Sequence, residues 1–199
     1  MFAQSKVAAA ILFYLITPSL ANAQEGRIYD RPTLVFFANG GGNSSLTDLN
    51  DAGTASLETG WTAGGGVGLQ VNQYVALRGT FDFAKANGDA GSLLSGETFN
   101  RYFYGGDVQL RYPTASGIAP YLILGAGAVT IDNPDNVAFN RFTKLAGKGG
   151  LGLEYLVPGT NVGFFAQGSS YVYDFDRNGF NQTQVDVLWT GGLSYRFSY

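Results

Sequence analysis

The sequence contains no cysteine and no histidine, and it is poor in charge. Without cysteine the chain has no disulfide, no thiol chemistry and no cysteine for N-terminal lipidation. Without histidine it lacks the usual general base of nucleophilic catalysis, and no residue spacing suggests a catalytic site, so we expect no enzymatic activity and no cofactor. Charged residues make up 14% of the chain, and the formal net charge of −3 argues against nucleic acid as a partner.

Beyond its N-terminal segment the sequence also has no apolar run long enough for a transmembrane helix, which needs about 20 residues. A chain that crosses a membrane without such a helix must do so as a closed β-barrel, because only then are its backbone polar groups all paired. The high contents of glycine and of aromatic residues are compatible with such strands: the chain has 29 glycines, and 15% of its residues are aromatic. A length of 199 residues is that of one domain.

The N-terminal segment has the layout of a secretory signal peptide. Lys6 precedes an apolar run over residues 7–16, and Ala21-Asn22-Ala23 follows as a cleavage site. The apolar run is too short for a membrane anchor, which would need about 20 residues. We therefore expect residues 1–23 to be a signal peptide and residues 24–199 to form the exported domain.

The clearest β-strand pattern lies at the end of the chain, in residues 185–199. Apolar and aromatic side chains occupy every second position, among them Val187, Trp189 and Tyr195, and polar or small residues lie between them. Alternation with a period of two is typical of a strand with one apolar face.

Seven further segments favour strands, at residues 32–39, 61–71, 74–83, 99–112, 120–131, 142–155 and 162–173. Residues 120–131 are apolar on both faces, so their orientation stays open. Polar stretches of residues 40–60, 84–98, 132–141 and 174–184 predict long loops after the first, third, fifth and seventh strands, with short turns between the others. Long loops at one end and short turns at the other are typical of outer-membrane barrels, and an even strand number places both termini in the periplasm.

Charged residues within the strands all fall on the face opposite the apolar set. They are Arg78, Asp82, Arg101, Asp107, Arg111, Lys144, Lys148, Glu154, Asp186 and Arg196. A soluble barrel would show the same segregation turned inside out, so this pattern alone does not choose the inner face. Glycines on the charged face favour a narrow interior, and we expect these residues to form an interior polar network.

Aromatic residues gather near the predicted strand ends, which predicts two girdles at the membrane interfaces. One rim would carry Tyr112, Tyr155, Tyr195, Phe197 and Tyr199, and the other Trp61, Phe81, Phe83, Tyr102 and Tyr173.

Two motifs resemble those of known proteins. Residues 190–197, TGGLSYRF, resemble the C-terminal assembly signal of outer-membrane barrels, with Gly192, Tyr195 and Phe197 in the motif positions and Tyr199 as the final aromatic. Residues 120–128, PYLILGAGA, resemble a stretch that recurs in small barrels of this kind.

The chain thus resembles the small eight-stranded outer-membrane barrels of the OmpA, OmpX and Ail type. That resemblance implies an all-β fold, an eight-stranded antiparallel up-and-down transmembrane β-barrel in the outer membrane of a Gram-negative bacterium. It also implies a monomer in contact with outer-membrane lipid, assembled by the barrel-assembly machinery.

One stretch resembles half of a calcium-binding loop. Asp174, Asp176 and Asn178 precede Gly179 in the pattern D-x-D-x-N-G, which supplies alternate oxygen ligands and a sharp bend. Val185 occupies the position of the required bidentate glutamate, so the ligand set is incomplete. An acidic hairpin loop with an Asn-Gly turn is the favoured alternative, and we assign no metal site.

Two functions remain open. The first is a structural and surface-interaction role, in which residues 40–60 and 84–98 are presented to an unknown extracellular partner. The second is a conduit or sensor for small hydrophobic molecules, of the OmpW-like type, for which only Phe103, Leu188 and part of residues 120–131 could line a pocket. We favour the first.

Overall fold

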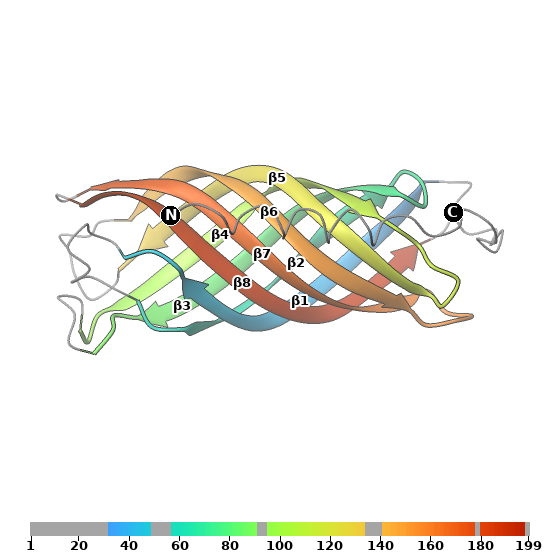
Figure 1. Cartoon of the computed structure of the whole chain (residues 1–199), viewed down its shortest axis with the longest axis horizontal. Coiled ribbons are helices and arrows are strands. Elements are labelled where there is room, and N and C mark those ends of the chain that lie inside the picture. Colours follow the sequence, from blue (N-terminus) through green and yellow to red (C-terminus); the bar gives the residue numbers. More distant parts are fainter. Residues whose placement is uncertain (1–31, 49–56, 91–94, 134–140, 178–179, 198–199) are drawn as a thin grey trace, which may run out of the picture.

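The computed structural model describes residues 32–48, 57–90, 95–133, 141–177 and 180–197. No helix within these ranges is long and apolar enough to cross a membrane. Eight antiparallel strands follow one another around a closed barrel, and each pairs with its neighbours in sequence. Figure 1 shows the resulting elongated barrel with its strongly tilted strands. The eight strands are β1 (Thr33–Ser45), β2 (Gly60–Gln70), β3 (Val75–Asn87), β4 (Thr98–Arg111), β5 (Ile118–Asp132), β6 (Phe142–Leu156), β7 (Val162–Arg177) and β8 (Phe180–Phe197).

The barrel closes where β1 pairs with β8, from Leu34 opposite Phe197 to Ser45 opposite Asp186. Closure pairs the edges of the sheet, so no strand edge faces the membrane. The predicted fold class is therefore confirmed.

The two ends of the barrel differ, and they are named here by their connections. Short turns at residues 71–74, 112–117 and 157–161 lie at what we call the turn end, where β8 also finishes (Figure 1). The links that follow β1, β3, β5 and β7 lie at the opposite end, which we call the loop end.

Local chemistry explains two of the short turns. Asn72 accepts hydrogen bonds through Oδ1 from the backbone N–H groups of Tyr74 and Val75, at 2.8 and 2.9 Å. Gly159 follows Pro158 and has a φ of 75°, and Thr160 N donates to Val157 O at 3.1 Å. These features are typical of a type II turn, which requires a residue with positive φ after the proline. Both turns were predicted from the sequence.

The strands are longer at the loop end than predicted. β1 continues through residues 40–45, β3 reaches Asn87, and β7 and β8 extend through most of residues 174–184. The prediction of a long loop after the seventh strand is therefore wrong, because only residues 178–179 separate β7 from β8. These extensions are polar and lack apolar alternation, but pairing with neighbouring strands, such as Asp174 opposite Thr183, holds them in the sheet.

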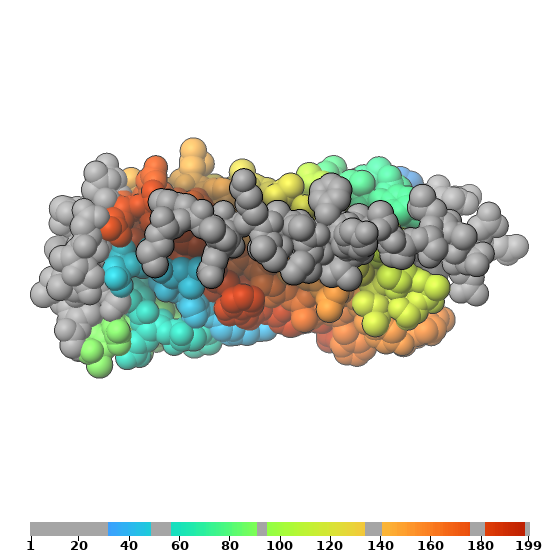
Figure 2. All heavy atoms as spheres, in the orientation of Figure 1, coloured from blue at the N-terminus to red at the C-terminus, as the bar shows by residue number. Residues whose placement is uncertain are grey.

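The ten charged residues named for the interior network lie on the inward faces of their strands, whereas Lys85 of β3 lies on the outward face and Asp174 of β7 is exposed. Apolar side chains cover the outside instead, where Leu124, Leu151 and Trp189 are between 53% and 63% exposed. The orientation of β5, which the sequence left open, places Tyr121, Ile123, Val129 and Ile131 inside and Leu122 and Leu124 outside. On the face drawn in Figure 2, side chains close the outer surface of the barrel wherever grey atoms do not cover it.

The described members of both predicted aromatic groups lie on the outer surface, with one exception, and Tyr199 lies outside the described residues. Trp61, Phe83 and Tyr102 form a connected cluster of rings, with centroid separations of 5.3 and 5.2 Å. Tyr173, predicted as a member of the same group, points inward and is only 4% exposed. Its hydroxyl donates to Asp186 inside the barrel, so the girdle assignment of Tyr173 is wrong.

Candidate functional site

The barrel interior is the first candidate site, because it brings together residues from all eight strands. Every residue of the predicted polar network is buried except Lys144, which is partly exposed. Three carboxylates of the network pair with cations and form three clusters along the barrel axis, and a fourth, Asp82, has neutral direct partners.

The cluster nearest the turn end is centred on Glu154 of β6. Its Oε2 lies 2.6 Å from Arg111 Nη2, and its Oε1 lies 2.7 Å from Arg196 Nη2. Ser194 Oγ also donates to Oε1, at 2.8 Å. One carboxylate therefore serves two guanidinium groups, and the cluster carries a net positive charge.

The middle cluster is centred on Asp107 of β4. Its Oδ1 accepts from Arg78 Nε at 2.6 Å, and its Oδ2 accepts from Lys148 Nζ at 2.8 Å. Lys148 Nζ also donates to Thr80 Oγ1 at 3.0 Å. Again one carboxylate serves two cations.

Asp82 lies closer to the loop end than Arg78 on the same strand. Asn39 Nδ2 donates to its Oδ1 at 3.1 Å, and the Tyr171 hydroxyl donates to its Oδ2 at 3.5 Å. This carboxylate therefore has neutral hydrogen-bond donors as its direct partners.

The cluster nearest the loop end joins Arg101 to Asp186. Arg101 also donates to Asn43 Oδ1 and, at 2.9 Å, to Ser45 Oγ. Ser45 Oγ and the Tyr173 hydroxyl complete the shell of Asp186, at 2.6 and 2.8 Å. Asn43 Nδ2 donates in turn to the Trp61 carbonyl at 2.8 Å, which holds β1 against β2.

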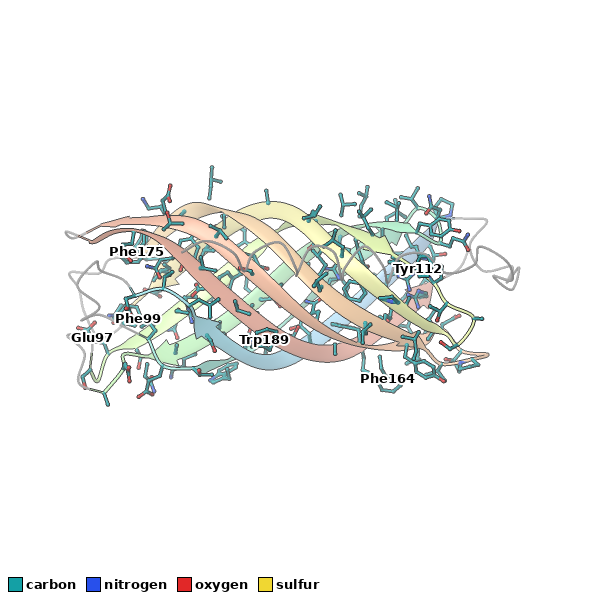
Figure 3. All side chains as sticks on the ribbon, in the orientation of Figure 1. Glu97, Phe99, Tyr112, Phe164, Phe175 and Trp189 are labelled. Atoms are coloured by element: carbon teal, nitrogen blue, oxygen red, sulfur yellow. The ribbon has the colours of Figure 1, made fainter. Side chains whose placement is uncertain are left out.

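An apolar core surrounds this last cluster, and we call it the apolar plug. It consists of Ala84, Phe99, Phe103, Val129, Ile131, Phe142, Ala146, Tyr171, Tyr173, Phe175 and Leu188. Ring centroids of Phe103 and Tyr171 lie 4.6 Å apart, and those of Phe142 and Phe175 lie 5.2 Å apart. Phe99 and Phe175 mark its position near the loop end, in contrast to Trp189 and Phe164 on the outer wall (Figure 3).

Sequence reasoning missed most of this plug. Phe99 shares the inward face of Arg101, and Phe142 shares that of Lys144 and Lys148. Strand parity was therefore available as a signal, but of the plug's aromatic residues only Phe103 was predicted to lie inside, and Tyr173 was assigned to a lipid-facing girdle. Phe99 is 1% and Tyr173 4% exposed, so both lie inside the barrel.

The described residues that resemble half of a calcium-binding loop do not form a loop in the structure, because they belong to a strand. Asp174 and Asp176 belong to β7, and Thr183 Oγ1 donates to Asp174 Oδ1 at 3.1 Å. Asn178 lies outside the described residues. No group of three or more acidic, histidine or cysteine side chains within the described ranges could hold a metal ion.

Residues of the possible assembly signal lie at the turn end of β8. Tyr195 and Phe197 face outward with ring centroids 4.6 Å apart, and Phe36 stacks edge-on against Phe197 at 5.4 Å. Gly192 faces inward, where a Cβ atom would lie 2.1 Å from the Ala38 carbonyl oxygen. Tyr199 lies outside the described residues. Recognition of this strand by the assembly machinery stays a prediction.

Comparison with solved structures supports the fold. Neisserial surface protein A is 16% identical with a TM-score of 0.61, covering 83% of this chain and 97% of that one. The N-terminal barrel domain of OprF from Pseudomonas aeruginosa is 15% identical with a TM-score of 0.52, covering 84% and 98%. OprG from the same species is 17% identical with a TM-score of 0.51, covering 86% and 98%. At these identities the likeness concerns the fold alone.

No curated protein matches the chain. Residues 7–197, however, match the family described as the outer membrane protein beta-barrel domain. The match covers almost the whole chain and agrees with the closed barrel, its apolar outer wall and its charged interior. The chain therefore belongs to the outer membrane protein β-barrel family and is a barrel of the bacterial outer membrane.

Proposed function

We propose that this barrel is a non-enzymatic protein that stabilises the outer membrane and presents its loop end to partners outside the cell. The apolar plug is the observation that supports this role, because it fills the interior beneath the loops. Phe103 and Leu188, the expected lining of a hydrophobic conduit, are 0% and 1% exposed and pack within it. A filled interior of this kind favours binding of partners at the outer surface over transport of molecules through the barrel.

The described bases of the first two loops are held by hydrogen bonds to the barrel and across the loop base. Leu46 N donates to Val185 O at 2.8 Å, and Gln184 Nε2 donates to Asp48 O at 2.8 Å. Gly88 N donates to Glu97 O at 2.9 Å across the base of the second loop.

Charge in these loops indicates the chemistry of a partner. Residues 46–59 contain Asp48, Asp51 and Glu58, residues 88–97 contain Asp89 and Glu97, and neither range contains lysine or arginine. Such a surface attracts positive charge and repels polyanions. We therefore propose a basic protein or another cationic surface as the partner.

The orientation and assembly of the barrel complete the proposal. With residues 1–23 removed as a signal peptide, both termini lie in the periplasm and the loop end faces the outside. The barrel-assembly machinery inserts the chain as a monomer surrounded by lipid. Cleavage and orientation are checked by mass spectrometry of the mature protein and by protease treatment of intact cells.

A binding experiment tests the surface role. Lipid vesicles that carry the barrel are passed over beads coated with lysozyme, a basic protein, and over beads coated with heparin. We expect retention on lysozyme that falls as salt rises, and no retention on heparin, because exposed charges are screened by salt. The triple variant Asp48→Asn, Asp51→Asn, Glu58→Gln should lose retention.

Charge-preserving substitutions provide the matched control. Asp48→Glu, Asp51→Glu and Glu58→Asp together keep the loop charge and should keep the retention. Equal retention of the neutralised variant, or a preference for heparin, would contradict the proposed partner chemistry.

The alternative function, a conduit for small hydrophobic molecules, is tested separately. An apolar dye is added to vesicles with and without the barrel, and its entry is followed by fluorescence. We expect the same rate in both, and a faster rate with the barrel would favour the conduit.

A further inference from the structure

A small cavity lies inside the barrel on the turn-end side, between the Asp107 and Glu154 clusters. Its volume is about 30 Å³, and Arg78, Arg196 and Gln70 contribute to its lining together with the ring of Phe37. A volume of this size accommodates one water molecule or one ion of similar size.

The charge around this cavity does not balance. Asp107 is shared by Arg78 and Lys148, and Glu154 is shared by Arg111 and Arg196. Each cluster therefore has two cations for one anion, and all six side chains are at most 7% exposed. Asp82 lies near both Lys148 and Arg78 and offsets part of the charge of the Asp107 cluster, so the unbalanced positive charge belongs to the Glu154 cluster. The charged groups that line the cavity are Arg78, Arg196 and Glu154 itself.

Two hydrogen-bond donors in the lining are buried without a partner. They are Gln70 Nε2 and Arg78 Nη2. Gln70 Oε1 accepts from Arg196 Nε at 3.3 Å, which leaves the amide nitrogen as the unused end of this side chain. Arg78 Nε is paired with Asp107 Oδ1, and the Phe37 ring covers one face of the guanidinium, with its centre 5.2 Å away. Nη2 is left without a hydrogen-bond acceptor. Buried donors, above all charged ones, are costly to leave unsatisfied.

These observations favour an anion over water in the cavity. Water would satisfy the donors but leave the excess positive charge of the Glu154 cluster uncompensated. A monovalent anion accepts the same hydrogen bonds and also offsets that charge, which matters more in a buried site because screening is weak there. A cavity of this volume suits a monatomic anion.

We propose that this cavity binds one halide-sized inorganic anion, held between Gln70 Nε2 and Arg78 Nη2. The anion links the Asp107 and Glu154 clusters and stabilises the folded barrel, because it binds a site that exists only after folding.

Thermal unfolding of the refolded full chain in lipid tests the site. Sodium chloride is compared with sodium gluconate at equal ionic strength, because gluconate is too large for the cavity. We expect the unfolding temperature to rise by about 3–5 °C for each tenfold increase of chloride above half-saturation. Equal unfolding temperatures in the two salts would overturn the proposal.

Two variants make the test specific. Gln70→Glu brings a carboxylate to the cavity and should abolish the response to chloride, whereas Gln73→Glu adds the same charge at the turn end outside this cavity and should respond like the wild type. A full chloride response in Gln70→Glu would show that chloride acts elsewhere.

Crystals of the unmodified chain soaked in sodium bromide give a readout that does not depend on the variants. We expect an anomalous peak between Gln70 Nε2 and Arg78 Nη2. A cavity without that peak, holding water alone, would overturn the proposal.

Discussion

Arg111 of β4 and Glu154 of β6 form an ion pair of 2.6 Å across the barrel interior, although β5 lies between their strands. Glu154 also pairs with Arg196 of β8, so one carboxylate joins three strands that share no backbone hydrogen bonds. The interior network therefore adds cross-links that the sheet alone does not provide.

Replacement of Glu154 by leucine should destabilise the barrel by about 3–5 kcal/mol, because it leaves two buried guanidinium groups without their counter-ion. Urea unfolding in lipid vesicles, followed by tryptophan fluorescence, measures the change. Glu58→Gln at an exposed site serves as the control and should leave the unfolding midpoint unchanged. Coinciding midpoints for Glu154→Leu and the wild type would count against a stabilising role for the cluster.

Loss of an interior cation should loosen the barrel without opening a pore. Arg78→Ala and Arg111→Ala remove side chains from the middle and turn-end clusters, but the apolar plug at the loop end stays in place. We expect no large steady conductance in planar lipid bilayers for either variant or for the wild type. Such a conductance in the wild type would mean that the plug does not close the interior.

Much of the interior could be predicted from the sequence, because strand side chains alternate with a strict period of two. Arg101 and Asp107 are separated by an even number of positions and face the same side of β4. The charged face was therefore identified correctly even where the strand ends were not. The pairing of Glu154 with both Arg111 and Arg196 could not be predicted, because it depends on the stagger between strands.

Two features required the structure. The polar strand extensions in residues 40–45, 174–177 and 180–184 contain little apolar alternation, and strand pairing together with interior contacts such as that of Ser45 with Asp186 holds them in the sheet. The apolar plug places Tyr173 inside, although it was expected to face lipid, and it also holds Phe175, which was expected in a loop. Side-chain chemistry alone does not distinguish a lipid-facing ring from a ring that fills the barrel.

Neighbouring glycines of β6 should respond oppositely to the same substitution. A Cβ atom on Gly150, which faces inward, would lie 2.6 Å from the Gly168 carbonyl oxygen, whereas one on Gly149 meets no atom within 4 Å. We expect Gly150→Ala to destabilise the barrel by about 1–3 kcal/mol through overpacking. Gly149→Ala should be neutral or stabilising by about 0.5–1 kcal/mol because it reduces the entropy of the unfolded chain. Urea midpoints measure both, and equal losses would contradict the assigned faces.

The orientation of β5 can be tested at two adjacent positions, because the chain contains no cysteine and a single introduced thiol is unique. Leu124 is 53% exposed on the outer wall, and Ile123 is 0% exposed inside. A nitroxide on Leu124→Cys should be relaxed strongly by oxygen, which concentrates in lipid, and weakly by a water-soluble nickel complex. The thiol of Ile123→Cys should resist maleimide in the folded barrel and react after boiling in detergent, because packing blocks its access. Rapid labelling at position 123 together with protection at position 124 would show that β5 has the opposite orientation. Its apolar residues now placed in the interior would then face the lipid.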